Sequence, residues 1–169
     1  LGMVGHVIAG DLKGAHPRVL QGLELVPADL EQLRQGRLGL DGLLLSDGCC
    51  DVYNPKVLRG SMGGVFRLPF LHAGNMAETV RILQERGLKC WACVVDGEAT
   101  PLPAAALGPR SVCVIGNEGA GLRPETAAAC AGRLTIPMAG RAESLNASMA
   151  AGIVMWEMTR RRQAFAGGA

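Results

Sequence analysis

Residues 114–121 read Val-Ile-Gly-Asn-Glu-Gly-Ala-Gly, so an apolar run ends in a glycine-rich turn that carries a carboxylate. Glycine-rich turns after strands commonly bind phosphate, yet Glu118 would repel one. The order of Gly116, Gly119 and Gly121 departs from the dinucleotide fingerprint, and the lysine of a P-loop is absent. Two interpretations stay open on these residues alone: glycines that only permit tight turns, or a loop that binds a group other than phosphate.

A second polar group opens the last helical stretch, where Ser144, Leu145 and Asn146 follow an Ile136-Pro137-Met138 segment. Ser144 is suited to cap this helix, because a serine side chain accepts hydrogen bonds from free backbone N–H groups. Asn146 would then lie beyond the cap with no evident structural task, which favours a role in a functional site.

The cysteines and histidines do not follow the pattern of a metal site. Cys90 and Cys93 form a C-x-x-C pair, but Cys49 and Cys50 are adjacent, which is poor geometry for zinc. The three histidines are spread along the chain and complete no ligand set. Because the C-x-x-C pair enters a strand-like run rather than a helix start, we expect reduced thiols, no metal and a cytoplasmic setting.

The composition fits one globular domain with at most a small appendage. Of the 169 residues, 49% are hydrophobic and 19% charged, and the formal net charge is +2. A nucleic-acid function would therefore rest on local clusters, namely Arg160–Arg162 or the group of Lys56, Arg59 and Arg67. Either cluster can equally be a solvated surface, and no aromatic stacking platform is evident. No apolar run reaches the length of a membrane span.

The expected fold is α/β. Beyond residue 38, short apolar runs alternate with helical stretches, which predicts a parallel sheet with helices on both faces. Ligands of such folds bind at the carboxyl ends of the strands. The expected strands are 41–46, 89–97, 111–116 and 133–138, with a further apolar segment at 65–71. The expected helices begin at residue 54 and cover 76–87, 124–132 and 144–165.

Residues 1–36 differ from the rest of the chain. A helix is expected over 5–15, a strand over 19–26 and a second helix over 27–36. This piece is too short to fold alone, so we interpret it as the remnant of a small α/β N-terminal domain.

The glycine loop, the Ile136-Pro137-Met138 strand end and the Ser144-Leu145-Asn146 helix start together resemble motifs two and three of the SPOUT methyltransferases. The closest branch is SpoU/TrmH, the RNA ribose 2′-O-methyltransferases, and residues 54–70 resemble the segment that precedes these motifs there. The resemblance covers residues 38–165. It implies a methyltransferase domain over 37–169 and a substrate-recognition remnant over 1–36.

The resemblance implies a deep trefoil knot whose loops bind S-adenosylmethionine. The residues that would hold this cofactor are Gly116, Asn117, Gly119, Ile136, Pro137, Met138 and Leu145. It places Glu118, Ser144 and Asn146 in the active site, where a carboxylate beside a sulfonium cation is favourable.

The reaction implied is in-line attack of a ribose 2′-hydroxyl of rRNA or tRNA on the sulfonium methyl group, with removal of one proton and no metal. The resemblance also implies a homodimer formed through the knot region and the last helix. The small and flexible side chains of that helix are compatible with such an interface: Ala150, Ala151, Gly152, Met155 and Met158.

The chain departs from the family at its first motif, an Asn…Gly…Arg segment whose arginine activates or orients the 2′-hydroxyl. Arg37 runs straight into Leu38 without the surrounding pattern, so no role is assigned to it. Either a stretch between these two residues lies outside this sequence, or the motif is deleted and the protein is a catalytically inactive RNA-binding dimer. A nucleotide-binding domain of the dinucleotide type is a third alternative.

Overall fold

The structure is a computed structural model, and it describes most of the chain beyond residue 40 and a short segment before it. The described residues are 7–10, 40, 42–47, 49–68, 70–117, 120–138 and 144–166, of which 7–10 and 161–166 are described in their backbone alone. The expected strand 19–26 and the expected helix 27–36 lie outside them, as do Arg37, Glu118 and Gly119.

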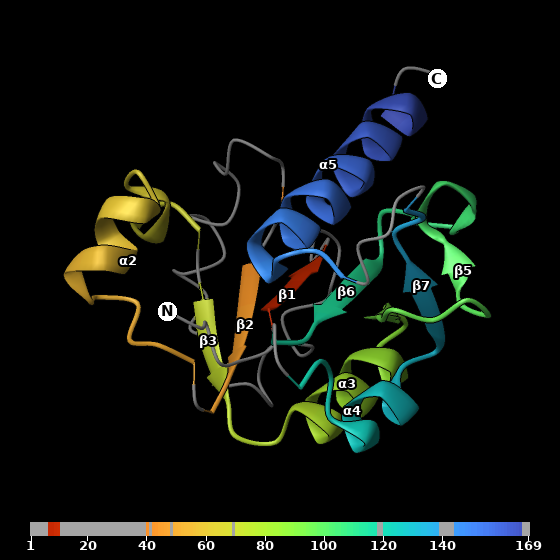
Figure 1. The fold of residues 1–169 in the computed structure, drawn as a ribbon, viewed down its shortest axis with the longest axis horizontal. Helices are drawn as coiled ribbons and strands as arrows, with labels where there is room; N and C mark the ends of the chain where they lie inside the picture. Colours follow the sequence, from red (N-terminus) through yellow and green to blue (C-terminus); the bar gives the residue numbers. More distant parts are fainter. Residues whose placement is uncertain are drawn as a thin grey trace.

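Within these segments a seven-stranded sheet has the order β3-β2-β1-β6-β4-β7-β5 (Figure 1). The strands are β1 Val7–Gly10, β2 Gly42–Ser46, β3 Phe70–Ala73, β4 Lys89–Cys93, β5 Thr100–Pro101, β6 Ser111–Ile115 and β7 Gly132–Thr135. The helices are α2 Pro55–Gly60, α3 Met76–Glu85, α4 Pro124–Ala129 and α5 Ala147–Ala166, and the 3-10 turns are η4 Gly64–Phe66 and η5 Leu102–Ala104.

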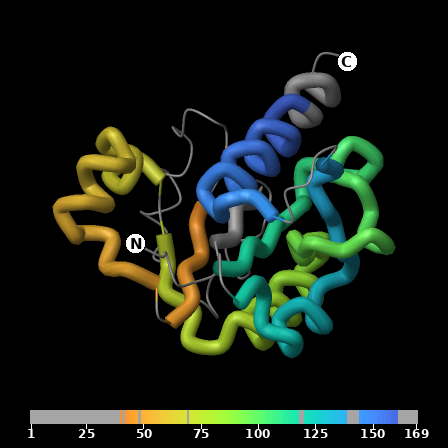
Figure 2. Tube along the Cα trace, viewed as in Figure 1, coloured from red at the N-terminus to blue at the C-terminus, as the bar shows by residue number. Residues whose placement is uncertain are grey.

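The sheet is mixed rather than fully parallel, which corrects the expectation from sequence. β1 pairs antiparallel with β2 on one side and with β6 on the other, whereas all other pairs are parallel. The helix expected over 5–15 is also wrong, because Val7–Gly10 is this strand. Figure 2 shows that different parts of the sequence lie at the two edges of the sheet, with orange and yellow segments at one edge and green and cyan segments at the other.

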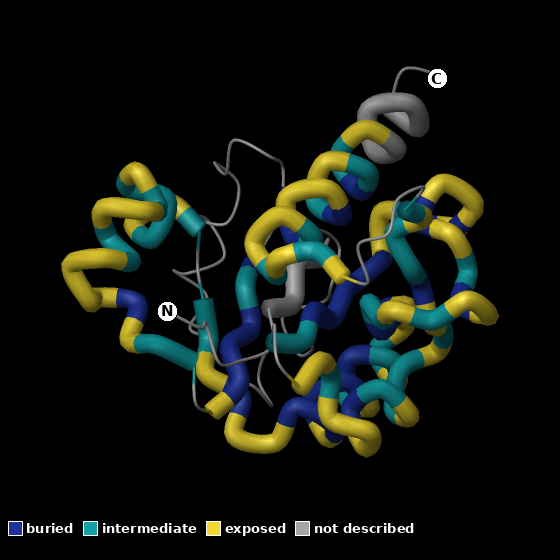
Figure 3. The backbone as a smooth tube through the Cα atoms, in the orientation of Figure 1, coloured by how far each residue is buried: buried dark blue, intermediate teal, exposed yellow. Residues whose placement is uncertain are grey.

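Helices cover both faces of the sheet, as expected. On one face, α3 and the end of α4 pack on β2, β4 and β6 through a core of nine buried residues: Leu44, Ala73, Met76, Val80, Leu83, Leu88, Cys90, Val112 and Val114. On the other face, η5 and α5 pack on β4, β6 and β7 through a second core of buried residues: Trp91, Leu102, Ala105, Leu107, Cys113, Leu134, Val154 and Met158. These buried segments form the dark centre of Figure 3.

Local sequence explains where the helices begin and end. The side chain of Asn54 accepts a hydrogen bond from the backbone N–H of Lys56 at the start of α2, and that of Asn75 accepts one from Glu78 at the start of α3. After α3 the chain turns at Gly87, whose φ of +82° favours glycine and confirms the expected stop. Within the described chain, none of the helices has the length and apolarity that a membrane crossing requires.

Candidate functional site

A cavity of about 540 Å³ lies at the carboxyl ends of β4, β6 and β7. These three strands run parallel, so the segments that follow them meet at one edge of the sheet, where α/β folds bind ligands. The first turns of α5 close the cavity. Its lining residues are Cys93, Val94, Val95, Ile115, Gly116, Asn117, Ala120, Gly121, Leu122, Leu134, Thr135, Ile136, Met138, Ser144, Leu145, Ala147, Ala150 and Val154.

The glycine loop after β6 is closed by its own backbone. The N–H of Asn117 donates to the carbonyl of Gly121 at 3.2 Å, and the N–H of Gly121 donates back to the carbonyl of Asn117 at 3.1 Å. The side-chain oxygen of Asn117 also accepts a hydrogen bond from the N–H of Ala120 at 2.6 Å. Gly121 has a φ of +63°, which a glycine adopts without strain.

Gly116 is required by this closure. A Cβ atom at Gly116 would lie 2.1 Å from the carbonyl carbon of Gly121 and 2.4 Å from the backbone nitrogen of Leu122. Since both contacts are with backbone, no rotamer change relieves them. Gly116 is thus fixed first by the fold of the loop, and the closed loop then forms one wall of the cavity.

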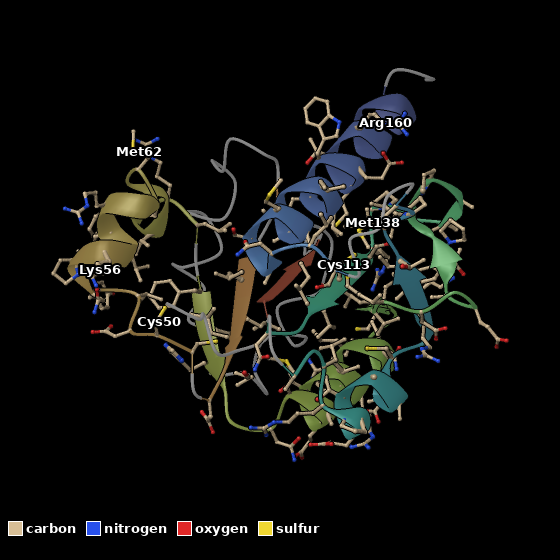
Figure 4. All side chains as sticks on the ribbon, viewed as in Figure 1. Cys50, Lys56, Met62, Cys113, Met138 and Arg160 are labelled. Atoms are coloured by element: carbon tan, nitrogen blue, oxygen red, sulfur yellow. The ribbon has the colours of Figure 1, made fainter. Side chains whose placement is uncertain are left out.

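The segment after β7 contributes Ile136 and Met138 to the cavity, whereas Pro137 is exposed and not part of the lining. Figure 4 shows Met138 between α5 and the carboxyl end of β7.

The start of α5 differs from the expectation. The helix begins at Ala147, and Asn146 caps it: its side-chain oxygen accepts a hydrogen bond from the N–H of Ser148 at 2.9 Å and another from the Ser148 hydroxyl. Asn146 therefore caps the helix, a role that the sequence suggested for Ser144. Ser144 is exposed and lines the cavity together with Leu145, whereas Asn146 is not among the lining residues.

The cavity wall carries no charge among the residues that the structure describes, since its described lining contains no Asp, Glu, Lys, Arg or His. The described lining contains the thiol of Cys93, whose pKa is raised well above 9.0 by a hydrogen bond with Cys113 and by burial. Within the described ranges no group of three metal-ligating side chains occurs, and all six cysteines are free thiols.

The structure thus brings together six of the expected site residues: Gly116, Asn117, Ile136, Met138, Ser144 and Leu145. Sequence reasoning missed Val94 and Val95, which follow β4. Their position directly after a buried apolar strand is a signal, but it becomes useful only when β4 is known to lie between β6 and β7.

Known proteins resemble this chain in sequence and in fold. The family model described as "SpoU rRNA Methylase family" matches residues 36–156. The 23S rRNA (guanosine-2′-O-)-methyltransferase RlmB of Vibrio parahaemolyticus is 39% identical over 113 residues, which are 66% of this chain and 44% of that protein.

Two solved structures have the same fold. The SpoU methyltransferase AviRb from Streptomyces viridochromogenes, in complex with the cofactor AdoMet, superposes with a TM-score of 0.68 at 29% identity, over 80% of this chain and 55% of that one. The AdoMet-bound rRNA methyltransferase from Sinorhizobium meliloti also has a TM-score of 0.68 at 29% identity, over 80% and 52%. The chain spans about half the length of these relatives.

Proposed function

The chain belongs to the SpoU rRNA methylase family, and on that premise we propose that it transfers a methyl group from S-adenosylmethionine to a ribose 2′-hydroxyl of rRNA or tRNA. RlmB of Vibrio parahaemolyticus is named for this reaction on 23S rRNA, and two structural neighbours hold AdoMet. The substrate of this chain is proposed as a class, RNA, rather than as one nucleotide.

The observation that carries the proposal is the uncharged cavity. Its volume of about 540 Å³ is in the usual range for cofactor sites, about 300–1,000 Å³. Its described wall contains apolar groups for an adenine ring, and it lacks the cations that would repel a sulfonium. S-adenosylmethionine, when bound, supplies an electrophilic methyl group on a good leaving group.

The chain's own part is to bind and align. Ile136, Met138 and Leu145 offer apolar contact for the adenosyl group, and the closed loop from Gly116 holds that wall in place. Ser144 is exposed at the cavity lining, where its hydroxyl can meet an incoming ribose. For Glu118 we retain a role beside the sulfonium or the RNA, and for Gly119 and Pro137 a cofactor contact, as proposals from the family resemblance.

Asn146 remains a proposed active-site residue, now with a second task. Its side-chain oxygen is engaged by Ser148, so a role toward the ribose would use its amide N–H groups. As a cap, Asn146 holds its amide in a fixed orientation at the start of α5. This supports a role in aligning the ribose rather than in removing the proton of its 2′-hydroxyl.

We also propose a homodimer that buries α5. This helix is apolar on two sides: Ala151, Val154 and Met158 face the core, while Met149, Ile153 and Trp156 are exposed. The last three are spaced i, i+4 and i+7, so they form one outward stripe that a second copy would cover. This replaces the expected dimer set, because Ala151 and Met158 are already buried in the core.

Three further features of the resemblance are kept as proposals. These are the trefoil knot, the derivation of residues 1–36 from a substrate-recognition domain, and a cytoplasmic location, which the six free thiols support.

The test is methyl transfer from labelled S-adenosylmethionine into bulk bacterial RNA, with alkaline digestion to identify ribose methylation. Incorporation at the 2′-position is expected. Titration calorimetry with S-adenosylhomocysteine and with NAD accompanies it, and only the first is expected to bind. RNA binding without incorporation would mean an inactive RNA-binding protein, and NAD binding would reject the proposed cofactor.

A further inference from the structure

The crossover between β2 and β3 forms a lobe at the edge of the molecule, residues 52–68, which we call the α2 lobe. It contains α2 and η4, and neither of them has a buried residue. Val52 anchors its start in the core with an exposed fraction of 7%. In Figures 1 and 3 the lobe lies beyond edge strand β3 and is mostly exposed. Such a segment is held by few core contacts and is available to a partner.

The α2 lobe is strongly basic. Lys56, Arg59 and Arg67 are all exposed, and residues 52–77 contain no Asp or Glu. Three positive charges in this stretch exceed the formal net charge of the whole chain, +2. In the part of the chain that the structure describes, no salt bridge engages any of the three. Their charges are therefore free to attract a polyanion.

The same lobe exposes large apolar side chains. Met62 is 85% exposed, Phe66 69% and Tyr53 60%. The Tyr53 ring is supported at its edge by Phe70, with ring centroids 6.1 Å apart. Tyr53 and Phe66 are two of the three exposed aromatic residues in the part of the chain that the structure describes, and Trp156 on α5 is the third. An aromatic-poor protein thus concentrates exposed rings where it concentrates unpaired cations.

The backbone presents these groups outward. Met62 has a φ of +50°, a region that residues other than glycine rarely adopt, and Gly63 follows with +79°. The turn is held by a hydrogen bond from the N–H of Gly64 to the carbonyl of Ser61, at 2.8 Å. The Arg67 guanidinium lies above this turn, 3.9 Å from the Cβ position of Gly63. Figure 4 shows Lys56 and Met62 at the outer side of the lobe.

We propose that the α2 lobe is a contact surface for a single RNA strand, an inference that rests on the proposed function. Lys56, Arg59 and Arg67 would contact successive phosphates, and the rings of Phe66 and Tyr53 would stack on unpaired bases. Unpaired bases are required because the bases of a duplex are already stacked. A second copy is a poorer occupant, because a symmetric contact would bring like charges together.

The first experiment tests the proposed phosphate contacts with a variant of the full chain that combines Lys56→Gln, Arg59→Gln and Arg67→Gln. Fluorescence anisotropy measures its binding to a labelled single-stranded RNA of about 12 nucleotides, a length within typical site sizes, at several salt concentrations. Each lost phosphate contact lowers the slope of log affinity against log salt by about 0.7. Three contacts therefore lower the slope by about 2 and the affinity at 0.1 M salt by about 100-fold.

The matched control removes the same charge elsewhere: Arg81→Gln, Lys89→Gln and Arg110→Gln, on α3 and at the amino ends of β4 and β6. It is expected to bind RNA as the unmodified chain does. In a separate arm, Phe66→Ala is expected to weaken binding at least about five-fold with an unchanged salt slope, because stacking carries no counterion release.

Several results would overturn the proposal: no RNA binding by the unmodified chain, equal binding by the triple variant, or an equal loss in the α3-side control. A changed mass of the lobe variants in light scattering, with RNA binding retained, would make the lobe an interface between copies instead. Calorimetry with S-adenosylhomocysteine tests the proposed function independently of the lobe, since the lobe variants should bind this ligand as the unmodified chain does. If the unmodified chain binds RNA through the lobe but not this ligand, only the proposed function fails.

Discussion

Replacing Gly116 by alanine tests whether closure of the glycine loop shapes the cavity. The added Cβ would lie 2.1 Å from the carbonyl carbon of Gly121, where two carbons in contact need about 3.5 Å. The loop must therefore retreat by about 1.4 Å. Hydrogen bonds of 3.1 and 3.2 Å between Asn117 and Gly121 cannot survive that displacement.

The magnitude follows from these two bonds. A backbone hydrogen bond contributes about 1 kcal/mol net, so Gly116→Ala is expected to lower the free energy of unfolding by about 2 kcal/mol. For a chain of this size that corresponds to a fall in Tm of about 4–8 °C. S-adenosylhomocysteine should bind at least about ten-fold more weakly, a loss of about 1.4 kcal/mol, because one cavity wall moves.

Differential scanning calorimetry and titration calorimetry measure the two effects, and two other glycines provide controls. Gly108→Ala meets no atom within 4 Å and has an ordinary φ, so it should change stability by less than about 0.5 kcal/mol. Gly121→Ala also meets no atom, and its φ of +63° adds only left-handed strain of about 1 kcal/mol. If Gly116→Ala behaves like Gly108→Ala in both assays, the role given to loop closure is refuted.

Substitutions at three further positions probe the helix cap, the core and the proposed dimer. Asn146→Ala should lose about 1 kcal/mol of stability with the cap, whereas Asn146→Asp keeps the acceptor and the stability; both should abolish methyl transfer, and an active Asp variant would exclude a role for the amide. Burial, with smaller contributions from Cys130 and Cys113, raises the pKa of Cys90 from 9.0 to about 12. The stability that this shift contributes is therefore complete below pH 9 and is lost between pH 9 and 12, by up to about 1.4 kcal/mol per pH unit. Urea unfolding across that range should show a shallower decline for Cys90→Ala, and equal slopes would contradict the assignment. Trp156→Glu should convert the dimer to a monomer in light scattering at unchanged Tm, and an unchanged mass would reject α5 as the interface.

The central α/β pattern could be predicted from sequence because its signals are local. The strand around Leu43–Leu45, the amphipathic helix around Val80 and Leu83 and the apolar run before Gly116 each lie where expected. The position of the cavity could be predicted for the same reason, since the loops after parallel strands meet at the carboxyl edge of the sheet.

The features that the sequence did not predict depend on contacts between distant residues, or on a choice between two residues of similar preference. Val7–Gly10 is a run too short for its periodicity to separate strand from helix, and its pairing partners, Ile115 among them, lie far away in sequence. Ser144 and Asn146 are both good caps, so the residue at which α5 begins decided which one reaches the free N–H groups. The exposed rings of the α2 lobe were missed because widely spaced aromatics form a surface only after the turn at Met62 is made.

Cys93 lines the cavity in which the proposed reaction places an electrophilic methyl group. A thiolate is a much stronger nucleophile than a ribose hydroxyl and would compete for that group. The hydrogen bond with Cys113 and burial raise the pKa of Cys93, so its sulfur keeps a proton at neutral pH. The core beneath the cavity thereby keeps the thiolate fraction of Cys93 low beside the proposed methyl donor. The same protonated thiol should make Cys93 slow to react with alkylating reagents.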